Sequence, residues 1–417
     1  MKDEKKHLSV LYDLSAAIVS ASRMEDVCKK ILDKVALLLN VNKASIMKFD
    51  KGERVLKIIA AKGLPKDVIS EARVKAGQGI SGHVFKSKKP VLIKDIRSTK
   101  FKSRTSYTTR SLMSAPVRSF PMKVQGKAIG VINVTDRKGK GSFTKSDMNL
   151  LTTIANQTAA YLHLCDLHEE ASRVEHLKRE LEIARGIQQS LLPRHIPKSH
   201  YFDIYGTCIM AERVGGDYFD ILSGGARPLS IVVADVAGHS ISAAMMMSAF
   251  RSALKAGGSA AIFSPAIAAE RLNAILYDDL VAAEQFISMV YMQFVSDKIV
   301  KYTTAGHHPP MILRGDSFTG NSTEDILLGV QKFAEYHERR IDLQKKDLIA
   351  VFTDGLVSAP NASGRRFGSE RLKESLKRHR HLTSHEMVNA ICNEVKAFAG
   401  KKALDDDVTL VIVKVLE

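Results

Sequence analysis

Two different periods of apolar residues run along the first part of the chain. From about 44 to 135, short apolar runs separated by turns predict a series of mostly antiparallel strands. A closing helix starts near "FTKSD", with Thr144 or Ser146 as its N-cap. Helix, strands and closing helix predict an α+β domain over 1–165. Before the strands, a three-to-four spacing over 8–40 predicts two helices, the second with an apolar face of Val27, Ile31, Val35 and Leu38.

The next segment, 166–193, is rich in charge and in helix-forming residues, and Pro193 and Pro197 end it. An apolar stripe on a polar helix usually faces a partner helix, so we expect a parallel dimeric coiled coil. A single helix packed on its own domain is the alternative. The spacing breaks between Val174 and Leu177, where the supercoil would change. The stripe consists of Leu164, Leu167, Ala171, Val174, Leu177, Leu181, Ala184, Ile187 and Leu191.

The remaining residues, 194–417, again alternate between apolar strands and turns. The runs "LSIVVADVAG", "FISMVYMQFV", "DLIAVFTDG" and "VTLVIVKV" are typical of buried strands. Two stretches with helical spacing, "SISAAMMMSAFRSALKAG" and "SPAIAAERLNAILYDDL", interrupt them. The pattern predicts a second domain of two packed sheets flanked by helices.

The composition agrees with two globular domains and a connector. The chain has 417 residues, 45% of them hydrophobic and 26% charged. No apolar run approaches the roughly 18 residues that span a bilayer, and the first residues do not resemble a signal peptide. The four cysteines are far apart and form no CxxC pair, which argues against disulfides and a thiolate zinc site. We therefore expect a cytoplasmic protein.

The formal charge of +17 could indicate a nucleic-acid or anionic-lipid partner. The basic residues, however, lie in small scattered groups with few aromatic residues between them. They are more typical of solvated faces that attract phosphorylated or acidic partners, and nucleic-acid binding stays an alternative.

Acidic residues stand where several strands of the second domain begin or end. Asp217 and Asp220 lie at the glycine turn "RVGGDYFDIL", and Asp235 and Asp354 each end an apolar strand just before a glycine turn. An acid in such a place is poorly solvated unless something compensates its charge. Carboxylates without a cysteine cluster point to Mg²⁺ or Mn²⁺ rather than Zn²⁺. Three more acids, Asp405, Asp406 and Asp407, precede the last strand.

The glycine turn also raises the possibility of a nucleotide cyclase, because "GGDYFD" resembles the GGDEF signature of diguanylate cyclases. Tyr218 stands where that signature has its glutamate. In this chain the other acids follow the turn, as far away as the C-terminus, whereas the cyclase has one earlier aspartate. The sequence therefore favours another metal enzyme.

Both halves of the chain resemble known families. "GQGISGHVFKSKKPVLIKDI", "RSLMSAPV", "GVINVTDR" and "FTKSD" resemble a GAF domain, which implies a sensor for a ligand that the sequence does not name. "VGGDYFD", "ADVAGHS", "TTAGHHPPMIL", "LIAVFTDGLVSA" and "DDDVTLVIV" resemble the metal-dependent PPM serine/threonine phosphatases. The branch is that of stage II sporulation protein E and bacterial stress-response regulators, which also have the motif "ELEIARGIQQSLLP" upstream. The implied fold is an αββα sandwich.

The second resemblance implies two Mn²⁺ or Mg²⁺ ions and a set of oxygen ligands. Asp220, Asp407, His239 and His307 would lie around the ligands and support them. Ser240 and Ser358 depart from the usual motifs, where glycine and glutamate are common, and touch none of the implied ligands. Those ligands are the carboxylates of Asp217, Asp235, Asp354 and Asp406 and the backbone carbonyl of Val236.

The implied activity is hydrolysis of phosphoserine or phosphothreonine by water activated on the metal ions, without a covalent intermediate. The implied substrate is a phosphorylated anti-sigma-factor antagonist of the STAS type, in a partner-switching stress response. The GAF domain and the linker would regulate the activity, and both would hold a homodimer. A GAF-regulated nucleotide cyclase and an inactive scaffold that only binds the antagonist are the alternatives.

Overall fold

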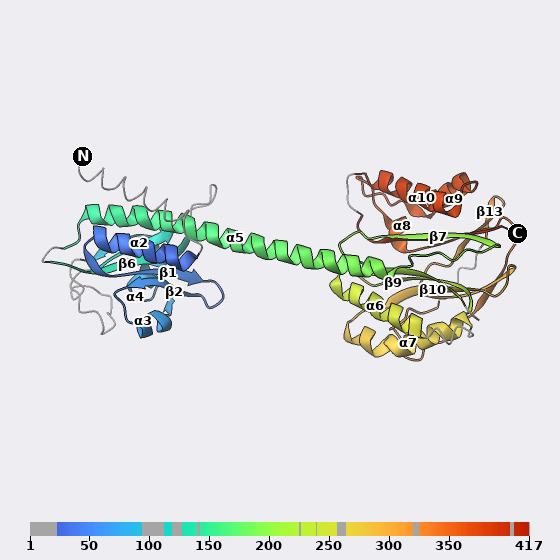
Figure 1. Cartoon of the computed structure of the whole chain (residues 1–417), viewed down its shortest axis with the longest axis horizontal. Coiled ribbons are helices and arrows are strands. Elements are labelled where there is room, and N and C mark those ends of the chain that lie inside the picture. Colours follow the sequence, from blue (N-terminus) through green and yellow to red (C-terminus); the bar gives the residue numbers. More distant parts are fainter. Residues whose placement is uncertain are drawn as a thin grey trace. The chain divides into compact units, whose positions relative to one another are not determined.

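The computed structural model of the protein divides into two compact units, Met1–Glu175 and His176–Glu417 (Figure 1). The helix expected over 8–22 and the stretches 94–111 and 119–126 of the expected strand run lie outside the described residues. The structure describes residues 23–93, 112–118, 127–139, 142–224, 227–238, 240–256, 264–319, 325–400 and 404–416.

In the first unit, a six-stranded antiparallel sheet has the strand order β3-β2-β1-β6-β5-β4. The strands are β1 (Val41–Asp50), β2 (Val55–Lys62), β3 (Val74–Lys75), β4 (Val91–Ile93), β5 (Leu112–Arg118) and β6 (Ala128–Arg137). The helices are α2 (Met24–Leu38), α3 (Lys66–Glu71), α4 (Gly79–Ser87) and α5 (Lys145–Leu191), which continues into the second unit. This confirms the expected α+β arrangement.

The sheet of the first unit has a core on each face. On one face, α2 and the first part of α5 pack against β1 and β6, and Val27, Ile31 and Val35 of α2 are buried there as predicted. On the other face, α4 covers a smaller core around Val84 and Leu56. Both faces are covered because the strands carry apolar side chains on both sides.

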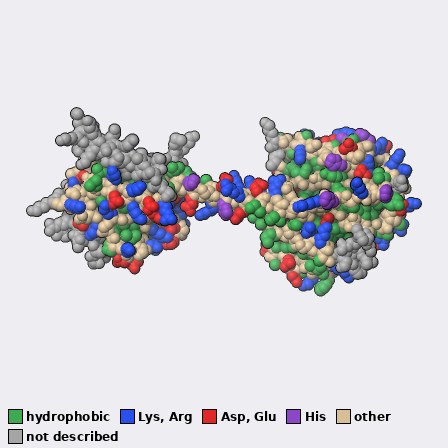
Figure 2. Space-filling view, viewed as in Figure 1, with side chains coloured by type: hydrophobic (Ala, Val, Ile, Leu, Met, Phe, Trp, Pro, Cys, Tyr) green, Lys and Arg blue, Asp and Glu red, His purple; other side chains and the backbone are tan. Residues whose placement is uncertain are grey.

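Helix α5 is one unbroken helix of 47 residues. Thr144 is its N-cap: the Thr144 hydroxyl accepts the Asp147 N–H at 3.2 Å, and the Asp147 carboxylate accepts the Thr144 N–H at 2.8 Å. The helix ends two residues before Pro193, as predicted. Among the described residues, no helix is both long enough and apolar enough to cross a membrane. The middle of α5 carries mainly charged and histidine side chains (Figure 2).

The second unit contains two five-stranded antiparallel sheets. The first has the order β14-β11-β10-β9-β8, and the second has the order β13-β12-β15-β16-β7. The first sheet contains β8 (Asp217–Gly224), β9 (Arg227–Val236), β10 (Ile287–Phe294), β11 (Ile299–Ala305) and β14 (Arg339–Asp342). The second contains β7 (Phe202–Ile209), β12 (Met311–Arg314), β13 (Ser317–Thr319), β15 (Leu348–Phe352) and β16 (Val408–Val415).

Helices cover the outer face of each sheet, as expected for two packed sheets with flanking helices (Figure 1). Helices α6 (Ile241–Ala256) and α7 (Pro265–Ala282) pack on the first sheet, and α9 (Gly368–His379) and α10 (Ser384–Ala399) pack on the second. Alternate residues of each strand point inward, so Val233 of β9 and Val411 of β16 belong to the core between the sheets.

Candidate functional site

Two of the acids singled out in the sequence lie directly opposite each other. Asp217, the first residue of β8, is paired with Asp235 near the end of β9. Asp217 shares its strand face with Phe219, and Asp235 shares its face with Val233, and both of these apolar residues belong to the core between the sheets. The two carboxylates therefore lie at one end of the space between the sheets.

Two hydroxyl groups from the opposite sheet hold the Asp217 side chain. Thr353, just after β15, and Thr409 of β16 donate hydrogen bonds to its Oδ2 atom at 2.7 and 2.6 Å. Asp217 is only 2% exposed, so these bonds replace water as partners of the carboxylate. The Oδ1 atom takes part in neither bond. Sequence reasoning missed both threonines, because a threonine at a strand end is unremarkable on its own.

Burial and neighbouring carboxylates raise the pKa of two of these acids. Burial, followed by the nearby carboxylates of Asp235 and Asp407, raises the pKa of Asp217 well above its usual range. Burial and the carboxylates of Asp354, Asp406 and Asp407 raise the pKa of Asp235 from 3.8 to about 7. The fold therefore brings together carboxylates that come from four separate parts of the chain.

Asp354 and Asp406 are brought next to each other by tight packing. Asp354 is the exposed first residue of the short helix α8 (Asp354–Ser358). The next residue, Gly355, lies so close to the last acids that a Cβ atom there would be 1.9 Å from the Asp407 carbonyl oxygen and 3.3 Å from the Asp406 Cβ. Glycine is needed at this position because any side chain would separate the two segments.

Close packing also explains the two glycines before Asp217, because a side chain at either position would collide with a neighbouring segment. A Cβ at Gly215 would lie 1.7 Å from the Asp407 Oδ2 atom, and one at Gly216 would lie 2.5 Å from the Val236 carbonyl oxygen. Asp407 is buried and accepts hydrogen bonds from the N–H groups of Ala211 (2.8 Å), Asp217 (3.4 Å) and Gly216. Asp407 thus holds the glycine turn in place from the side of the last strand.

Asp220 lies apart from these acids. It is on the opposite face of β8 from Asp217, because residues three apart in a strand point to opposite sides. Its carboxylate accepts a hydrogen bond from the Tyr218 hydroxyl at 2.6 Å and forms an ion pair with Lys255 of α6 at 2.5 Å. Any support that Asp220 gives to a metal ligand must pass through the strand.

The remaining residues singled out in the sequence are two histidines and the two serines that differ from the usual family motifs. His239 lies outside the described residues. His307 is buried between the sheets, 2.6 Å from the Ser288 hydroxyl and 3.1 Å from the Phe352 carbonyl oxygen, and burial lowers its pKa to about 4. The neutral ring therefore donates to Phe352 and accepts from Ser288, which ties the two sheets together.

The Ser240 hydroxyl accepts the Ala243 N–H at 3.4 Å at the start of α6. The Ser358 side chain makes no hydrogen bond or ion pair with the residues that the structure describes.

Sequence reasoning also missed Gln188 of α5. Its side-chain amide donates to the Gly215 carbonyl oxygen at 2.6 Å and accepts the Gly215 N–H at 3.0 Å. Gln188 is 3% exposed although it belongs to the charged linker helix. Its signal was present in the sequence, because it stands seven residues after Leu181, where the apolar stripe would place another apolar residue.

The donor set fits a hard divalent cation, although it is not arranged as a complete metal site. No group of three or more His, Cys, Asp or Glu side chains among the described residues is placed so as to hold a metal ion as it stands. The acids instead show uncompensated negative charge, as the raised pKa values of Asp217 and Asp235 indicate. All the donors are oxygen atoms, which Mg²⁺ and Mn²⁺ prefer.

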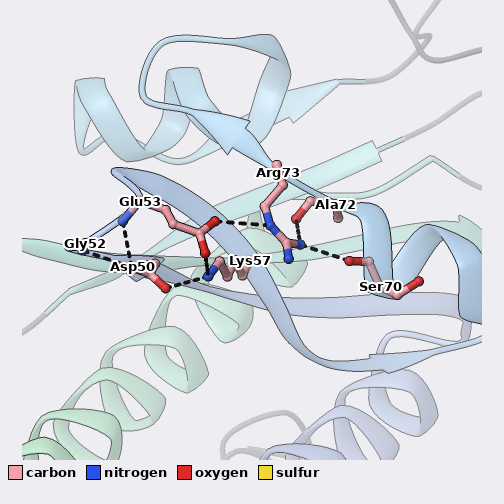
Figure 3. Close-up of polar contacts among 7 residues, drawn as sticks. All are labelled: Asp50, Gly52, Glu53, Lys57, Ser70, Ala72 and Arg73. Atoms are coloured by element: carbon pink, nitrogen blue, oxygen red, sulfur yellow. Dashed lines mark hydrogen bonds and ion pairs between the residues drawn. The ribbon is translucent and has the colours of Figure 1, made fainter.

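The first unit has an open groove of about 690 Å³ between the β1–β2 hairpin and α5. Two of its lysines are paired with acids: Lys48 binds Asp166, and Lys57 binds Asp50 at 2.6 Å and Glu53 at 2.5 Å. Figure 3 shows that Glu53 also meets Arg73, which donates hydrogen bonds to the carbonyl oxygens of Ser70 in α3 and of Ala72 just after it. Because these charges satisfy one another, the groove does not indicate a particular ligand.

Each of the two units matches the model of a known protein family. Residues 23–162 match the GAF domain model, and residues 225–416 match the model of stage II sporulation protein E (SpoIIE). Asp235, Asp354 and Asp406 fall inside the second match, and Asp217 precedes it. The second unit is thus a serine/threonine phosphatase domain of the PPM (PP2C) class. The chain joins this SpoIIE-type domain to a GAF domain, which confirms both resemblances.

Individual relatives agree with this assignment. Phosphoserine phosphatase RsbU of Bacillus subtilis is 28% identical over 245 residues, which cover 58% of this chain and 71% of RsbU. Protein IcfG of Synechocystis is 25% identical over 261 residues, but these are only 41% of its length. The solved SiaA-PP2C domain of Pseudomonas aeruginosa shares the fold, with a TM-score of 0.52, 20% identity, and coverage of 58% of this chain and 99% of that domain. The relatives do not favour a nucleotide cyclase or an inactive scaffold.

Proposed function

We propose that this phosphatase is metal-dependent and that it removes phosphate from serine of an anti-sigma-factor antagonist of the STAS type, in a partner-switching stress response in the cytoplasm. The single observation that carries the metal dependence is the meeting of Asp217, Asp235, Asp354 and Asp406 at one end of the sandwich. The similarity to RsbU, which is named as a phosphoserine phosphatase, supports the substrate class.

The residues of the chain have distinct roles in this proposal. Asp217, Asp235, Asp354, Asp406 and the Val236 carbonyl would hold two Mn²⁺ or Mg²⁺ ions. Bound there, the ions would lower the pKa of a water and withdraw charge from the phosphate. Thr353 and Thr409 orient the Asp217 carboxylate, and Asp407 holds the backbone before it. Asp220, His239 and His307 remain proposed supporting positions.

Cation dependence is the direct test of this proposal. Chelation of the full-length protein with EDTA should abolish phosphate release from serine-phosphorylated casein, and Mn²⁺ or Mg²⁺ should restore it. Zn²⁺ should not, because it prefers nitrogen and sulfur donors in a tetrahedral arrangement. Phosphate release is measured colorimetrically, with heat-treated enzyme as the control. Full activity in EDTA, or recovery with Zn²⁺ alone, would contradict the metal assignment.

The proposed division of the chain is a GAF sensor over 1–165, a coiled-coil linker over 166–193 and a phosphatase domain over 194–417. Exposed apolar side chains of the stripe on α5 support the proposal of a partner helix. Leu164 is 62% exposed, Leu177 is 53% exposed and Ile187 is 59% exposed. Apolar side chains in such a row are covered when two copies of the helix pair. We therefore propose a homodimer held by the linker and the GAF domain.

Replacing Leu177 and Leu181 by Glu should break the proposed pairing. Four like charges would face one another across the dimer seam, so the double variant should lose linker-driven self-association, and its basal phosphatase activity should change. Light scattering gives the mass, and phosphate release gives the activity. The control, Ser172→Glu with Gln189→Glu, adds the same charge at exposed positions outside the stripe. Wild-type mass and activity in the Leu177/Leu181 variant would mean that the helix is only a spacer.

A further inference from the structure

His307 lies between the two sheets of the second unit, at the end where the acids meet. It follows β11 of the first sheet after a turn at Gly306. Its Nδ1 atom is 2.6 Å from the Ser288 hydroxyl of β10. Its Nε2 atom is 3.1 Å from the carbonyl oxygen of Phe352, the last residue of β15 in the second sheet. The ring therefore connects the two sheets through one hydrogen bond at each nitrogen.

Both partners of the ring adjoin a proposed metal ligand. Ser288 of β10 is directly opposite Asp235 of β9. Residues opposite each other in antiparallel strands point to the same face with their Cβ atoms about 5 Å apart, so these two side chains are neighbours. Phe352 precedes Asp354, the first residue of α8, by two residues. His307 thus joins the strand beside one acid to the segment that leads into the other.

The two partners determine which ring nitrogen carries the hydrogen. A carbonyl oxygen only accepts hydrogen bonds, so the Nε2 atom of His307 donates to Phe352. In the neutral ring the Nδ1 atom is then an acceptor, and the Ser288 hydroxyl donates to it. The His307 side chain is 3% exposed, and both of its nitrogens have protein partners. The ring is therefore not placed to transfer a proton to a substrate.

The spacing of the sheets at this end determines how far apart the Asp235 and Asp354 carboxylates lie, because Asp235 belongs to the first sheet and Asp354 follows the second. Metal ligands must lie within about 0.2 Å of their proper distance. The apolar contacts between the sheets are non-directional, whereas a hydrogen bond has a narrow range of distance and angle. A bridge of two hydrogen bonds therefore fixes the spacing more closely than apolar packing does.

A second link joins the sheets at the same end. Thr353 and Thr409 donate to the Asp217 carboxylate at 2.7 and 2.6 Å. That link ends on a proposed metal ligand, whereas the His307 link ends on a hydroxyl and a carbonyl that are not proposed ligands. The two links hold successive residues, because the Phe352 carbonyl accepts from His307 and the Thr353 hydroxyl donates to Asp217. Together they fix the segment directly before α8.

We propose that His307 is a positioning residue that sets the separation of Asp235 and Asp354 by linking Ser288 to the Phe352 carbonyl across the two sheets. This inference rests on the proposed function, because the two acids are metal ligands only under that proposal. It gives the buried histidine a defined task where the family resemblance implied only a supporting position. It also assigns Ser288, which the sequence did not single out, to the same task.

Two substitutions of His307 each keep one half of the link. Glutamine places an amide nitrogen near the position of Nε2, so His307→Gln keeps the donor to Phe352 and loses the acceptor for Ser288. Asparagine places an oxygen near the position of Nδ1, so His307→Asn keeps the acceptor and loses the donor. The matched control is His308→Gln, the same change at the neighbouring exposed histidine. Circular dichroism and thermal unfolding without metal establish that each full-length variant is folded.

Calorimetric titration with Mn²⁺ is the main measurement. Both His307 variants should bind Mn²⁺ roughly tenfold or more weakly, because loss of a group that orients a ligand typically costs 10- to 100-fold in affinity. Their turnover of para-nitrophenyl phosphate at saturating Mn²⁺ should also fall, and the Mn²⁺ affinity of His308→Gln should match the wild type. A merely structural role would lower the unfolding temperature and leave the Mn²⁺ dissociation constant unchanged.

Ser288→Ala tests the other end of the link. It removes the hydroxyl and leaves the ring in place, so it should also weaken Mn²⁺ binding. His307→Gln has already lost this hydrogen bond, so adding Ser288→Ala to it should change the Mn²⁺ dissociation constant by a smaller factor than in the wild type. Equal factors in the two backgrounds would show that Ser288 acts without His307, which overturns the link.

The outcomes separate this inference from the proposed function. Folded His307 variants with wild-type Mn²⁺ affinity and turnover overturn the positioning role while the metal site stands. An effect in only one of two folded His307 variants overturns the two-ended link. If neither folds, Ser288→Ala alone decides, and unchanged Mn²⁺ affinity in it overturns the proposal. Failure of the wild type to bind Mn²⁺ at all overturns the proposed metal site, and this inference with it.

Discussion

Asp235→Asn and Asp354→Asn are each expected to remove nearly all hydrolysis of para-nitrophenyl phosphate in the presence of Mn²⁺. A bound ion contributes several kcal/mol to the transition state, and 1.4 kcal/mol is a factor of ten, so the turnover should fall on the order of 10³-fold. Asp235 faces the other acids, and Asp354 is exposed at the start of α8. Neither is part of the apolar core, so both variants should fold. Substantial activity in either one would remove that residue from the metal site.

The pH dependence of metal-free stability provides an independent control for Asp235. Its pKa is raised to about 7 in the folded protein from an ordinary value of 3.8. A raised pKa of an acid means that folding loses stability as the pH rises from about 4 through 7. Without metal, Asp235→Asn should therefore be more stable than the wild type at pH 8, by up to a few kcal/mol, and similar at pH 4. Equal stability at both pH values would show that Asp235 does not meet the other carboxylates.

Gly355→Ala is expected to cause a large loss of stability and, with it, of activity. The new Cβ would lie 1.9 Å from the Asp407 carbonyl oxygen and 3.0 Å from its carbonyl carbon. Both are backbone atoms, so no side-chain rotation can relieve the contact, and α8 must separate from the last strand. We expect a cost of at least about 3 kcal/mol, which is roughly 6–12 °C in the unfolding temperature of a domain of this size.

The control for this prediction is Gly186→Ala. Nothing lies within 4 Å of a Cβ at Gly186, which stands inside helix α5. Alanine is a better helix former than glycine by about 1 kcal/mol, so this variant should be as stable as the wild type or slightly more stable. Thermal unfolding of the two variants side by side measures the difference. If Gly355→Ala unfolds like Gly186→Ala, the close contact between α8 and the last acids is wrong.

Local patterns predicted most elements of both units. The apolar face of α2 repeats with the helical period, β9 and β16 are apolar runs buried along almost their whole length, and α5 ends before Pro193. The closing helix of the first domain and the linker were predicted as separate segments. They are one helix, because no residue between them interrupts helical geometry.

The candidate site could be predicted only in part. The acids stood out because carboxylates at the ends of apolar strands need compensation, and the family motifs placed the same residues. Asp217 and Asp220 stand at the same glycine turn, and it was the family resemblance that implied a ligand at Asp217 and a supporting role at Asp220. In the strand they point to opposite faces, and only Asp217 faces Asp235. The alternation of side chains along β8 therefore separates Asp217 from Asp220.

The sequence by itself determined the two domains, the helix between them and the oxygen chemistry of the acids, because these depend on residue types and local periodicity. Only the tertiary structure decided which groups meet. Asp407 bonds to the backbone of Asp217 across 190 positions, and Gln188 reaches Gly215 from another element. Such contacts depend on how two sheets and a helix pack, and no local pattern along the chain records that packing.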